Sequence, residues 1–385
     1  MRFRRLIRSS VVLHAVSICL LFGAFLNWCT WNLHTNYVKG VRKNDEILEL
    51  HVKDNIQTRP NHRDLQVHVI IISRWRYGSS FTGDVFNKNY DFSYFYEPLR
   101  HKTSRNQETH NVLHQDHVTM LRDILKCEFT DKNYTWWDDE DTKMNCWRSC
   151  KFGASVMCEH HNRLNKRVHE KRTGLTVNNR LHVQRNAIQT SRMVEEICRS
   201  GKHVAIKTVR VPDLKHLKSI VMDDSLNVKV IQLVRDPRGV YLSRKVMPDV
   251  VDMELSECDE LKNNLKYWKD PPPWLKGRYM LLRYEDLVDK PIQMVQIIYN
   301  FLGIPVPEHV KTWLLINAKK LPFKSAYSWR TKINYETMVN VQEYCMEILL
   351  MTGYKAINSK RYLTDLNQPS IVQLSYPLMP RVPNS

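Results

Sequence analysis

An apolar run that ends abruptly in a glycine-containing loop limits the fold more than any other stretch of this sequence. Residues 67–73 (VHVIIIS) have the composition of a buried strand, residues 74–81 (RWRYGSSF) form the loop, and a helix-like segment follows at 82–87. A strand, a glycine loop and a helix start in this order can hold a phosphate or sulfate on backbone N–H groups at the helix N-terminus. The sequence therefore predicts a strand–loop–helix unit with an anion site.

The side chains of this loop indicate which anion chemistry it supports. Gly78 lets the backbone approach an anion closely, and Ser79 and Ser80 offer hydroxyl and amide donors at the helix start. Arg76 adds a fixed positive charge with forked donors. A nucleotide P-loop has a Lys after the glycine and a Ser or Thr that holds magnesium, but no Lys follows Gly78 in this loop. The loop therefore suits an anion that needs no metal, and an ordinary strand-to-helix turn with an exposed Arg76 is the alternative.

A second strand-to-helix junction carries a matching set of groups. Residues 228–234 (VKVIQLV) predict another buried strand, with Arg235 at its carboxyl end. Asp236 is a predicted N-cap and Pro237 a predicted first helical residue, which puts Ser243 nearly two turns into the helix. Arg235 and Ser243 can then face the crevice beside the first loop, where ligands bind in open α/β sheets, and together they suit a phosphate monoester. A capped helix with a surface Arg235 is the alternative.

Short apolar strands alternate with helical segments from residue 67 onward. This order predicts an α/β fold, a P-loop-like parallel sheet with helices on both faces, in a domain that spans 67–355. The predicted strands are 67–73, 92–96, 203–209, 228–234 and 279–284, and the predicted helices are 113–127, 259–269, 292–302 and 338–351. Residues from about 100 to 200 have the composition of a loop-rich insertion with disulfides. Residues 356–385 contain four prolines and little periodicity, which predicts a C-terminal tail.

The N-terminal sequence predicts a membrane anchor. Residues 11–29 are almost uninterruptedly apolar and span roughly 28 Å as a helix, close to a bilayer core of about 30 Å. Arginines cluster before this stretch, so residues 1–10 are a predicted cytosolic tail, and residues 30–66 a predicted stem in the secretory lumen. A cleaved signal peptide is the alternative, but residues 26–28 (LNW) offer no small-x-small site. We expect a single-pass type II protein with a lumenal domain.

The cysteine content agrees with that compartment, and the charge points to an anionic partner. The net charge is +18, and without the four arginines of residues 1–10 the chain has 54 Lys and Arg against 40 Asp and Glu, or +14. A phosphorylated donor or an acidic glycan fits this charge, and a solvated basic surface is the alternative. Seven cysteines follow the anchor, and disulfides are favoured over zinc because Cys146, Cys150 and Cys158 match no common zinc spacing. Asn133 begins a glycosylation sequon.

Taken together, the two junctions resemble those of the sulfotransferase superfamily, whose members use 3′-phosphoadenylyl sulfate as donor. Residues 76–81 (RYGSSF) resemble its 5′-phosphosulfate loop, with Tyr77 as the departure from the pattern Arg-Ser/Thr-Gly-Ser-Ser-Phe, and residues 235–243 resemble its 3′-phosphate motif. The resemblance is in particular to the Golgi galactose, N-acetylglucosamine and N-acetylgalactosamine 6-O-sulfotransferases. Further matching stretches follow in order, namely 95–99 (FYEPL), 205–210 (AIKTVR), 271–273 (PPP), 278–287 (RYMLLRYEDL) and 327–330 (YSWR).

This resemblance implies a sulfotransferase fold and transfer of a sulfuryl group to the 6-hydroxyl of a sugar. It implies Glu97 as general base, with Arg76 and Lys207 stabilising charge. A turn carboxylate paired with a nearby Arg is the alternative for Glu97, and His101 and His203 are rival bases. No metal is implied. The implied donor-binding residues are Arg76, Tyr77, Gly78, Ser79, Ser80, Phe81, Thr82, Arg235, Asp236, Pro237, Arg238, Ser243, Tyr284 and Arg330.

The expected partners are a glycan or proteoglycan acceptor and the membrane, with a homodimer as a candidate assembly. A nucleic-acid partner is not expected, because the anchor puts the basic surface in the lumen. A P-loop-type phosphotransferase is the nearest alternative enzyme, although the missing loop Lys and the lumenal placement speak against it. A non-catalytic, membrane-tethered glycan-binding protein would use the basic charge but leaves both phosphate motifs without a purpose.

Overall fold

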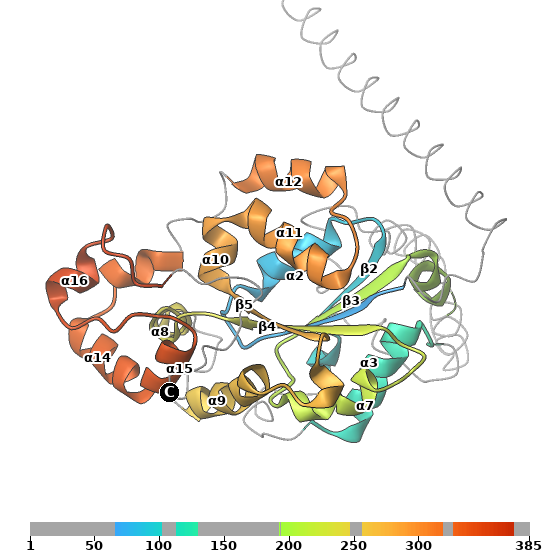
Figure 1. Ribbon diagram of the computed structural model, residues 1–385, viewed down its shortest axis with the longest axis horizontal. Helices are drawn as coiled ribbons and strands as arrows, with labels where there is room; N and C mark the ends of the chain where they lie inside the picture. Colours follow the sequence, from blue (N-terminus) through green and yellow to red (C-terminus); the bar gives the residue numbers. More distant parts are fainter. Residues whose placement is uncertain are drawn as a thin grey trace, which may run out of the picture. The chain divides into compact units, whose positions relative to one another are not determined.

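Figure 1 shows the computed structural model of the chain, which we describe for residues 66–101, 113–129, 192, 194–246, 256–318 and 326–372. The predicted cytosolic tail and anchor, the stem up to residue 65, the sequon at Asn133 and the cysteines at 146–158 lie outside these residues. Within the described ranges, no helix combines the length and the apolar character that a membrane crossing requires.

Five parallel strands form the central sheet, in the order β2-β3-β1-β4-β5 (Figure 1). They are β1 (His68–Ile72), β2 (Phe92–Tyr96), β3 (His203–Thr208), β4 (Val228–Val234) and β5 (Tyr279–Arg283). Each falls on a predicted run to within one residue at either end. All five residues of the central strand β1 are buried, because a parallel sheet with helices on both faces buries both sides of its strands. The predicted parallel sheet is therefore confirmed.

Helices cover both faces of this sheet (Figure 1). α2 (Ser79–Asn87) and α11 (Pro291–Leu302) pack on one face, and α3 (Gln115–Lys126) and α7 (Lys218–Val221) pack on the other. Alternate residues of β1 accordingly enter two separate hydrophobic clusters. Further helices are α8 (Pro237–Lys245), α9 (Ser256–Lys269), α10 (Tyr284–Asp289), α12 (Glu308–Ala318), α14 (Tyr335–Tyr344), α15 (Met346–Met351) and α16 (Lys360–Thr364), and the 3-10 helices are η2 (Pro98–His101), η5 (Leu214–Leu217), η6 (Pro273–Leu275) and η7 (Ser328–Thr331).

Three segments differ in detail from the sequence predictions. The predicted helix at 338–351 is two helices, α14 and α15, which meet at Cys345. α3 comes from the predicted insertion, yet it fills the core beneath the sheet with side chains such as Leu121 and Ile124. The predicted tail begins at residue 356, but Ile357 and Leu363 are buried in one cluster with Trp329. Residues 356–372 therefore pack on the domain, because burial of these apolar side chains away from water is favourable.

Two disulfides join distant parts of the described chain, Cys127–Cys198 and Cys258–Cys345. The first ties the end of α3 to the segment before β3, and the second ties α9 to the junction of α14 and α15. The sequence predicted disulfides but left their pairing open, because separations of 71 and 87 residues carry no local signal. In the chain-entropy model, closing loops of this length stabilises the fold by about 4 kcal/mol each.

Candidate active site

The loop after β1 is shaped by Gly78. This residue has a φ of 89°, in the left-handed region, and is the N-cap of α2. A Cβ at this position would lie 2.1 Å from Cδ2 of Tyr284, so any other residue would displace the ring or the loop. The loop backbone is thus pressed against an aromatic ring. The N-terminus of α2 then lies at the carboxyl edge of the sheet, where its N–H groups and dipole favour an anion.

The predicted loop residues do not all face the same way. The Tyr77 side chain is 1% exposed and packs in the hydrophobic core, where burial raises the pKa of its hydroxyl far above the usual value. The exposed Ser80 places its hydroxyl 3.4 Å from that of Tyr96. Ser79 and Thr82 are buried in the first turn of α2. Tyr77 departs from the family pattern, but its side chain points into the core and not toward the anion site.

The two predicted phosphate motifs meet at Arg76. Its Nε donates to Oγ of Ser243 at 3.0 Å, and its carbonyl accepts from Nη1 of Arg235 at 2.7 Å. The Arg235 guanidinium lies over the Tyr284 ring, 4.9 Å from the centroid. Arg76 still reaches solvent, yet partial burial and the neighbouring Arg235 lower its pKa. A doubly charged anion would relieve this repulsion between two cations, which is what a phosphate monoester offers.

α8 begins as the sequence predicted. Asp236 is its N-cap and accepts from the backbone N–H of Arg238 at 3.0 Å, with Pro237 in the first turn. The fully buried Arg238 side chain donates to the Asp236 carboxylate at 2.9 and 2.8 Å and to Oε1 of Gln342 at 2.6 Å. Its guanidinium also lies over the Trp329 ring. These contacts fix the start of α8 from inside the domain. The N–H groups of Arg238 therefore donate to acceptors within the protein.

Arg330 has a comparable environment. The side chain is 2% exposed and donates to four backbone carbonyls of the segment 362–368 at 2.6 to 3.1 Å. A buried guanidinium must satisfy its N–H groups, and here the C-terminal segment supplies the acceptors. The resemblance implied donor binding for both Arg238 and Arg330. The structure instead gives both side chains protein partners, whereas Arg76, Arg235, Ser243 and Tyr284 are brought together.

Glu97 comes directly after β2 and belongs to a buried ion-pair cluster. Its carboxylate accepts from Nζ of Lys207 at 2.5 Å and from Nη1 of Arg210 at 2.7 Å. The backbone N–H of Val209 donates to the same oxygen as Arg210, at 3.2 Å. Both interpretations of Glu97 therefore find support, because the carboxylate stands at the carboxyl edge and is also paired with an Arg.

A chain of contacts links this cluster to the first loop. Nζ of Lys207 lies over the ring of Tyr96, 4.4 Å from its centroid. The Tyr96 hydroxyl in turn lies beside that of Ser80, in the first turn of α2. The proposed base and the anion loop therefore occupy neighbouring positions at one edge of the sheet.

Arg76 and Glu97 also share a rare backbone conformation. Among the described residues other than glycine, a positive φ occurs at Arg76 (68°), Glu97 (49°) and Cys127 (54°). Such a conformation costs of order 1–3 kcal/mol and persists where the surrounding structure enforces it, often at ligand sites. Two of these three residues are predicted catalytic residues, which supports a functional site at this edge.

His203 and His101, the two alternative bases, lie at different places in the domain. His203 begins β3 at the opposite edge of the sheet, where its Nδ1 accepts from the backbone N–H of Val67 at 3.1 Å and burial lowers its pKa. His203 as a base is therefore wrong. His101 ends η2, four residues after Glu97. In the part of the chain that the structure describes, no group of three or more His, Cys, Asp or Glu side chains could hold a metal ion.

Sequence reasoning missed two arginines that complete the edge. The guanidinium of Arg210 lies over the indole of Trp75, 5.5 Å from its centroid. Arg244 donates to the Trp75 carbonyl at 3.1 Å and to Oε2 of Glu257 at 2.7 Å, which anchors the first loop on α9. Both arginines are sequence neighbours of predicted site residues, and that proximity was the available signal.

Comparison with known proteins shows the family of this chain. A family model described as "Sulfotransferase domain" matches residues 66–343. Carbohydrate sulfotransferase 1 of Homo sapiens is 32% identical over 349 residues, which cover 80% of this chain and 83% of that protein. Carbohydrate sulfotransferase 3 of Tetronarce californica is 27% identical over 338 residues, covering 77% of this chain and 75% of that protein. The solved sulfotransferase domain from the curacin biosynthetic pathway has a TM-score of 0.38 and 16% identity, covering 72% of this chain and 97% of that one.

The fold and the match to the family model define the chain as a sulfotransferase. The chain belongs to the carbohydrate sulfotransferase family, because relatives of that name share about a third of its residues over four fifths of its length. It is therefore an enzyme of sulfuryl transfer.

Proposed function

We propose that this enzyme transfers a sulfuryl group from 3′-phosphoadenylyl sulfate to the 6-hydroxyl of a galactose, N-acetylglucosamine or N-acetylgalactosamine residue in a glycan. The observation that carries the proposal is the contact of Arg76 with Ser243 and Arg235, where two phosphate motifs far apart in sequence meet. The sulfotransferase domain supports this donor, and the relatives support a sugar acceptor. The 6-position rests on the resemblance of both motifs to 6-O-sulfotransferases.

The residues present fit such a donor. Two phosphorylated ends require two anion sites, and the chain offers Arg76 with the N-terminus of α2 for one and Arg235 with Ser243 for the other. The missing Cβ of Gly78 lets the loop backbone lie flat on Tyr284. When bound, the donor supplies the sulfuryl group, with 3′-phosphoadenosine 5′-phosphate as the leaving group. The remaining contributors are Ser79, Ser80, Phe81 and Thr82 on α2, and the cap formed by Asp236 and Pro237.

Glu97 is the proposed base. A sugar hydroxyl is a poor nucleophile, and a carboxylate at this edge can take its proton. Among the described residues, Arg210 and the Val209 N–H donate to Oε2, and Lys207 donates to Oε1. Oε1 is therefore the oxygen that accepts the proton. Once Oε1 exchanges Lys207 for the hydroxyl, the ammonium group can stabilise the negative charge that develops on the leaving phosphate.

The proposed setting is the Golgi lumen, with a single-pass type II anchor at 11–29, a stem at 30–66 and an N-linked glycan on Asn133. The basis is the apolar N-terminal stretch, the arginines before it and the sequon. Two disulfides in the described residues suit an oxidising compartment. A homodimer belongs to this proposal as a candidate assembly.

The direct test is to offer labelled donor with keratan, chondroitin and terminal N-acetylglucosamine acceptors and to locate the sulfated carbon. Arg76→Ala and Arg235→Ala are each expected to lower transfer by at least about 100-fold, because each removes a charge from the donor site. Arg361→Ala, at an exposed position on α16, is the matched control and should keep full activity. Transfer retained in both donor-site variants would contradict the proposed function.

A further inference from the structure

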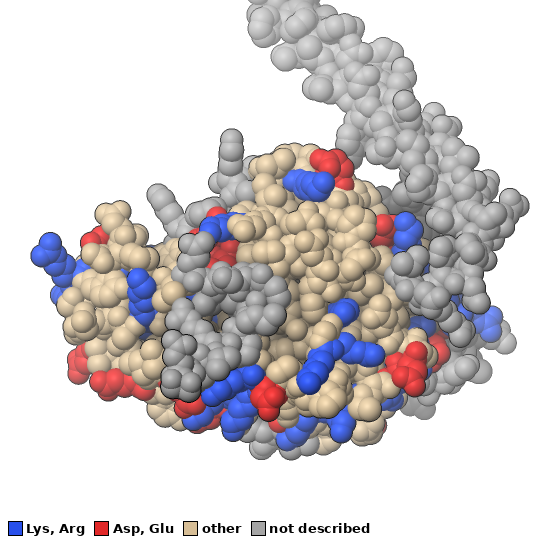
Figure 2. All heavy atoms as spheres, viewed as in Figure 1, with Lys and Arg blue, Asp and Glu red and all other residues tan. Residues whose placement is uncertain are grey.

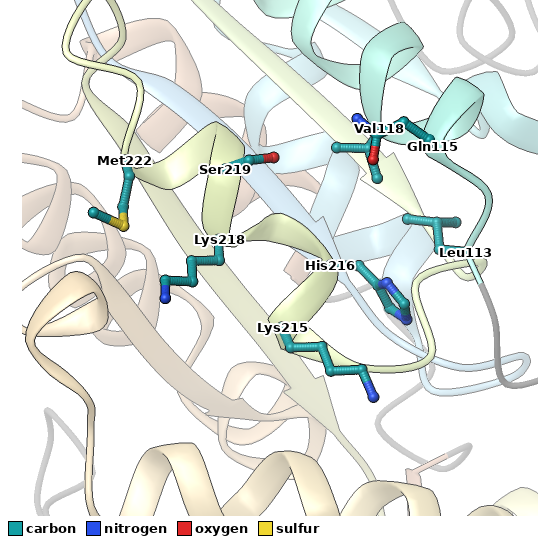
Figure 3. Close-up of a pocket in the computed structure, with 8 residues that line it drawn as sticks. All are labelled: Leu113, Gln115, Val118, Lys215, His216, Lys218, Ser219 and Met222. Carbon is teal, nitrogen blue, oxygen red and sulfur yellow. The ribbon is translucent and has the colours of Figure 1, made fainter.

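The cations of this domain differ in how far they reach solvent. In a hollow of about 380 Å³ between α3 and the segment formed by η5 and α7, Lys215 and Lys218 are exposed (Figure 3). Arg244, in the last turn of α8, has a side chain that is 3% exposed, and Arg74, at the start of the first loop, is 16% exposed. A guanidinium away from water needs acceptors for its N–H groups, so the partners of these two arginines indicate what they do.

Two glutamates of α9 are the partners of these arginines. Nη2 of Arg244 donates to Oε2 of Glu257 at 2.7 Å, and its Nη1 donates to Oε1 of the same carboxylate. Arg74 forms an ion pair with Glu260. The carbonyl of Trp75 accepts from Nε and Nη2 of Arg244 at 3.3 and 3.1 Å. Two consecutive residues of the first loop are therefore tied to α9, one directly and one through Arg244.

The residue on the other side of Arg76 also packs with α9. Tyr77 is 1% exposed and lies in one hydrophobic cluster with Leu261 of α9. Between these held residues, Arg76 has a φ of 68° and donates to Ser243. A left-handed conformation at an arginine persists where the surrounding structure enforces it, and α9 supplies contacts on both sides of this residue.

Helix stability is the simpler role for Glu257. It lies in the first turn of α9, where a carboxylate stabilises the helix dipole with or without a partner. That role does not explain why both of its oxygens accept from a buried arginine. Glu260 lies after the first turn and pairs with an arginine of the same loop. The two carboxylates therefore share a task that the helix by itself does not require.

α9 is itself fixed by a covalent bond. Cys258, the neighbour of Glu257, forms a disulfide with Cys345 at the end of α14. Gln342, three residues before Cys345, accepts from Nη1 of Arg238 at 2.6 Å, at the start of α8. The disulfide thus joins the helix that supports the first loop to the helix that supports the second phosphate motif.

We propose that Glu257 and Glu260 are positioning residues for the donor. Through Arg244 and Arg74 they hold the first loop in the conformation that keeps Arg76 in the donor site, so the donor meets a preformed site. Both glutamates act through arginines, and the first loop and Glu97 carry the chemistry. The inference rests on the proposed function, because it concerns how the same donor site is held.

The test measures the affinity for 3′-phosphoadenosine 5′-phosphate by calorimetry, well below the unfolding temperature of each variant. Lost stability alone does not change binding under that condition. Glu257→Gln and Glu260→Gln should each weaken binding and raise the KM for the donor about 10-fold, and leave the KM for the acceptor unchanged. Adding Glu257→Gln to Arg244→Met should weaken binding no further, because Glu257 acts through that arginine.

Glu347→Gln is the matched control, because it breaks an exposed ion pair with Lys262 of the same helix. Figure 2 shows acidic side chains among basic ones along the lower edge over α7 and α9, and exposed pairs of this kind contribute little. This variant should keep the wild-type affinity. If Glu257→Gln does not fold, Arg244→Lys replaces it, since an ammonium group cannot hold the carboxylate and the Trp75 carbonyl as the guanidinium does.

Two results would contradict different claims. If both glutamine variants bind 3′-phosphoadenosine 5′-phosphate as tightly as the wild type while Arg76→Ala binds it weakly, the inference is wrong and the proposed function stands. If the wild type does not bind this nucleotide, the proposed function is wrong. Hydrogen exchange of the amides of residues 75–81 then decides whether α9 holds the loop. Faster exchange in Glu257→Gln than in Glu347→Gln supports the inference, and equal exchange overturns it.

Discussion

Two groups of cations at the carboxyl edge of the sheet differ in whether a carboxylate offsets their positive charge. On the donor side, Arg76 lies against Arg235, and no carboxylate of the described residues pairs with Arg76. On the acceptor side, Lys207 and Arg210 both pair with the buried Glu97. The donor side thus leaves positive charge for a ligand to neutralise, whereas on the acceptor side the Glu97 carboxylate offsets one of the two positive charges. This difference is what the proposed function requires, in which the donor side binds a multiply charged anion and the acceptor side moves a proton.

The supports of the two sides differ as well. The donor side leans on Tyr284, whose ring contacts both Gly78 and the guanidinium of Arg235. An aromatic ring can pack against both the loop backbone and the guanidinium without adding a charge, so the positive potential of the donor side is preserved. The acceptor side is instead held by its own ion pairs. A mutation on the donor side should therefore act mainly on binding, and one on the acceptor side on turnover and on stability together.

The largest expected effect is at Glu97. Glu97→Gln should lower kcat by about 100- to 10,000-fold and leave the affinity for 3′-phosphoadenosine 5′-phosphate unchanged. It should also lower the free energy of unfolding by roughly 3–5 kcal/mol, because Lys207 and Arg210 lose their buried counter-charge. Kinetics, product-binding calorimetry and urea unfolding measure the three quantities.

Glu97→Gln/Lys207→Met separates the two roles of the carboxylate. Removing one unbalanced cation should restore part of the stability but none of the turnover. If Glu97→Gln kept wild-type turnover, the acceptor side would be a purely structural cluster, and the proposed difference in function between the two sides would be wrong.

The next largest effect is expected at Gly78, on the donor side. In Gly78→Ala the new Cβ meets the Tyr284 ring at 2.1 Å, so the loop must shift and the KM for the donor should rise at least about 10-fold. Gly303→Ala is the matched control, with a φ of 75° but no atom within 4 Å of the added Cβ. It should cost about 1 kcal/mol of stability and leave the KM for the donor unchanged. Equal kinetic effects of both substitutions would mean that contact with Tyr284 does not shape the loop.

A smaller effect concerns the buried carboxylate beneath the donor side. Glu285 accepts from the backbone N–H of Asp236 at 3.2 Å and from the hydroxyl of Tyr354 at 2.7 Å. Burial and the nearby Asp236 raise the pKa of Glu285 to about 7. The folded protein therefore binds more protons than the unfolded chain between about pH 4.5 and pH 7, and the Glu285 contribution to stability falls as pH rises through that window.

The comparison with Glu285→Gln isolates this contribution. His68 acts in the opposite direction, because burial, with His203 nearby, lowers its pKa to about 4, so its contribution rises as pH increases from 4 to 6.5. Stability should therefore increase more between pH 5 and pH 7 in Glu285→Gln than in the wild type, by on the order of 2 kcal/mol. Urea unfolding at pH 5, 6 and 7 measures the two slopes, and identical slopes would refute the titration of Glu285.

The smallest effect is expected at Tyr77. Because its side chain packs in the core behind the loop, Tyr77→Phe should leave the KM for the donor unchanged and alter the free energy of unfolding by about 1 kcal/mol or less. Steady-state kinetics with varied donor checks this expectation. A marked rise in KM would place the hydroxyl on the donor side after all.

Local patterns predicted the sheet and the two junctions well. A run such as VHVIIIS is apolar on both faces, so it fits a central parallel strand whatever its neighbours are. Asp236 and Pro237 mark a helix start through bonds that lie within three residues. The predicted tail was wrong for residues 356–372 because a few buried side chains, such as Leu363, hold a segment that has no periodicity.

The sequence by itself determined the strands, the capped helices and the chemical types at the two phosphate motifs, because each depends on neighbours along the chain. Only the tertiary structure decided which side chains meet. The order β2-β3-β1-β4-β5 brings Glu97 beside Lys207 across 110 residues and Arg76 beside Ser243 across 167. Packing of the C-terminal part of the domain also directs Arg238 and Arg330 inward, where Gln342 and backbone carbonyls of residues 362–368 accept from them. Such contacts follow from strand order and packing, which no local pattern encodes.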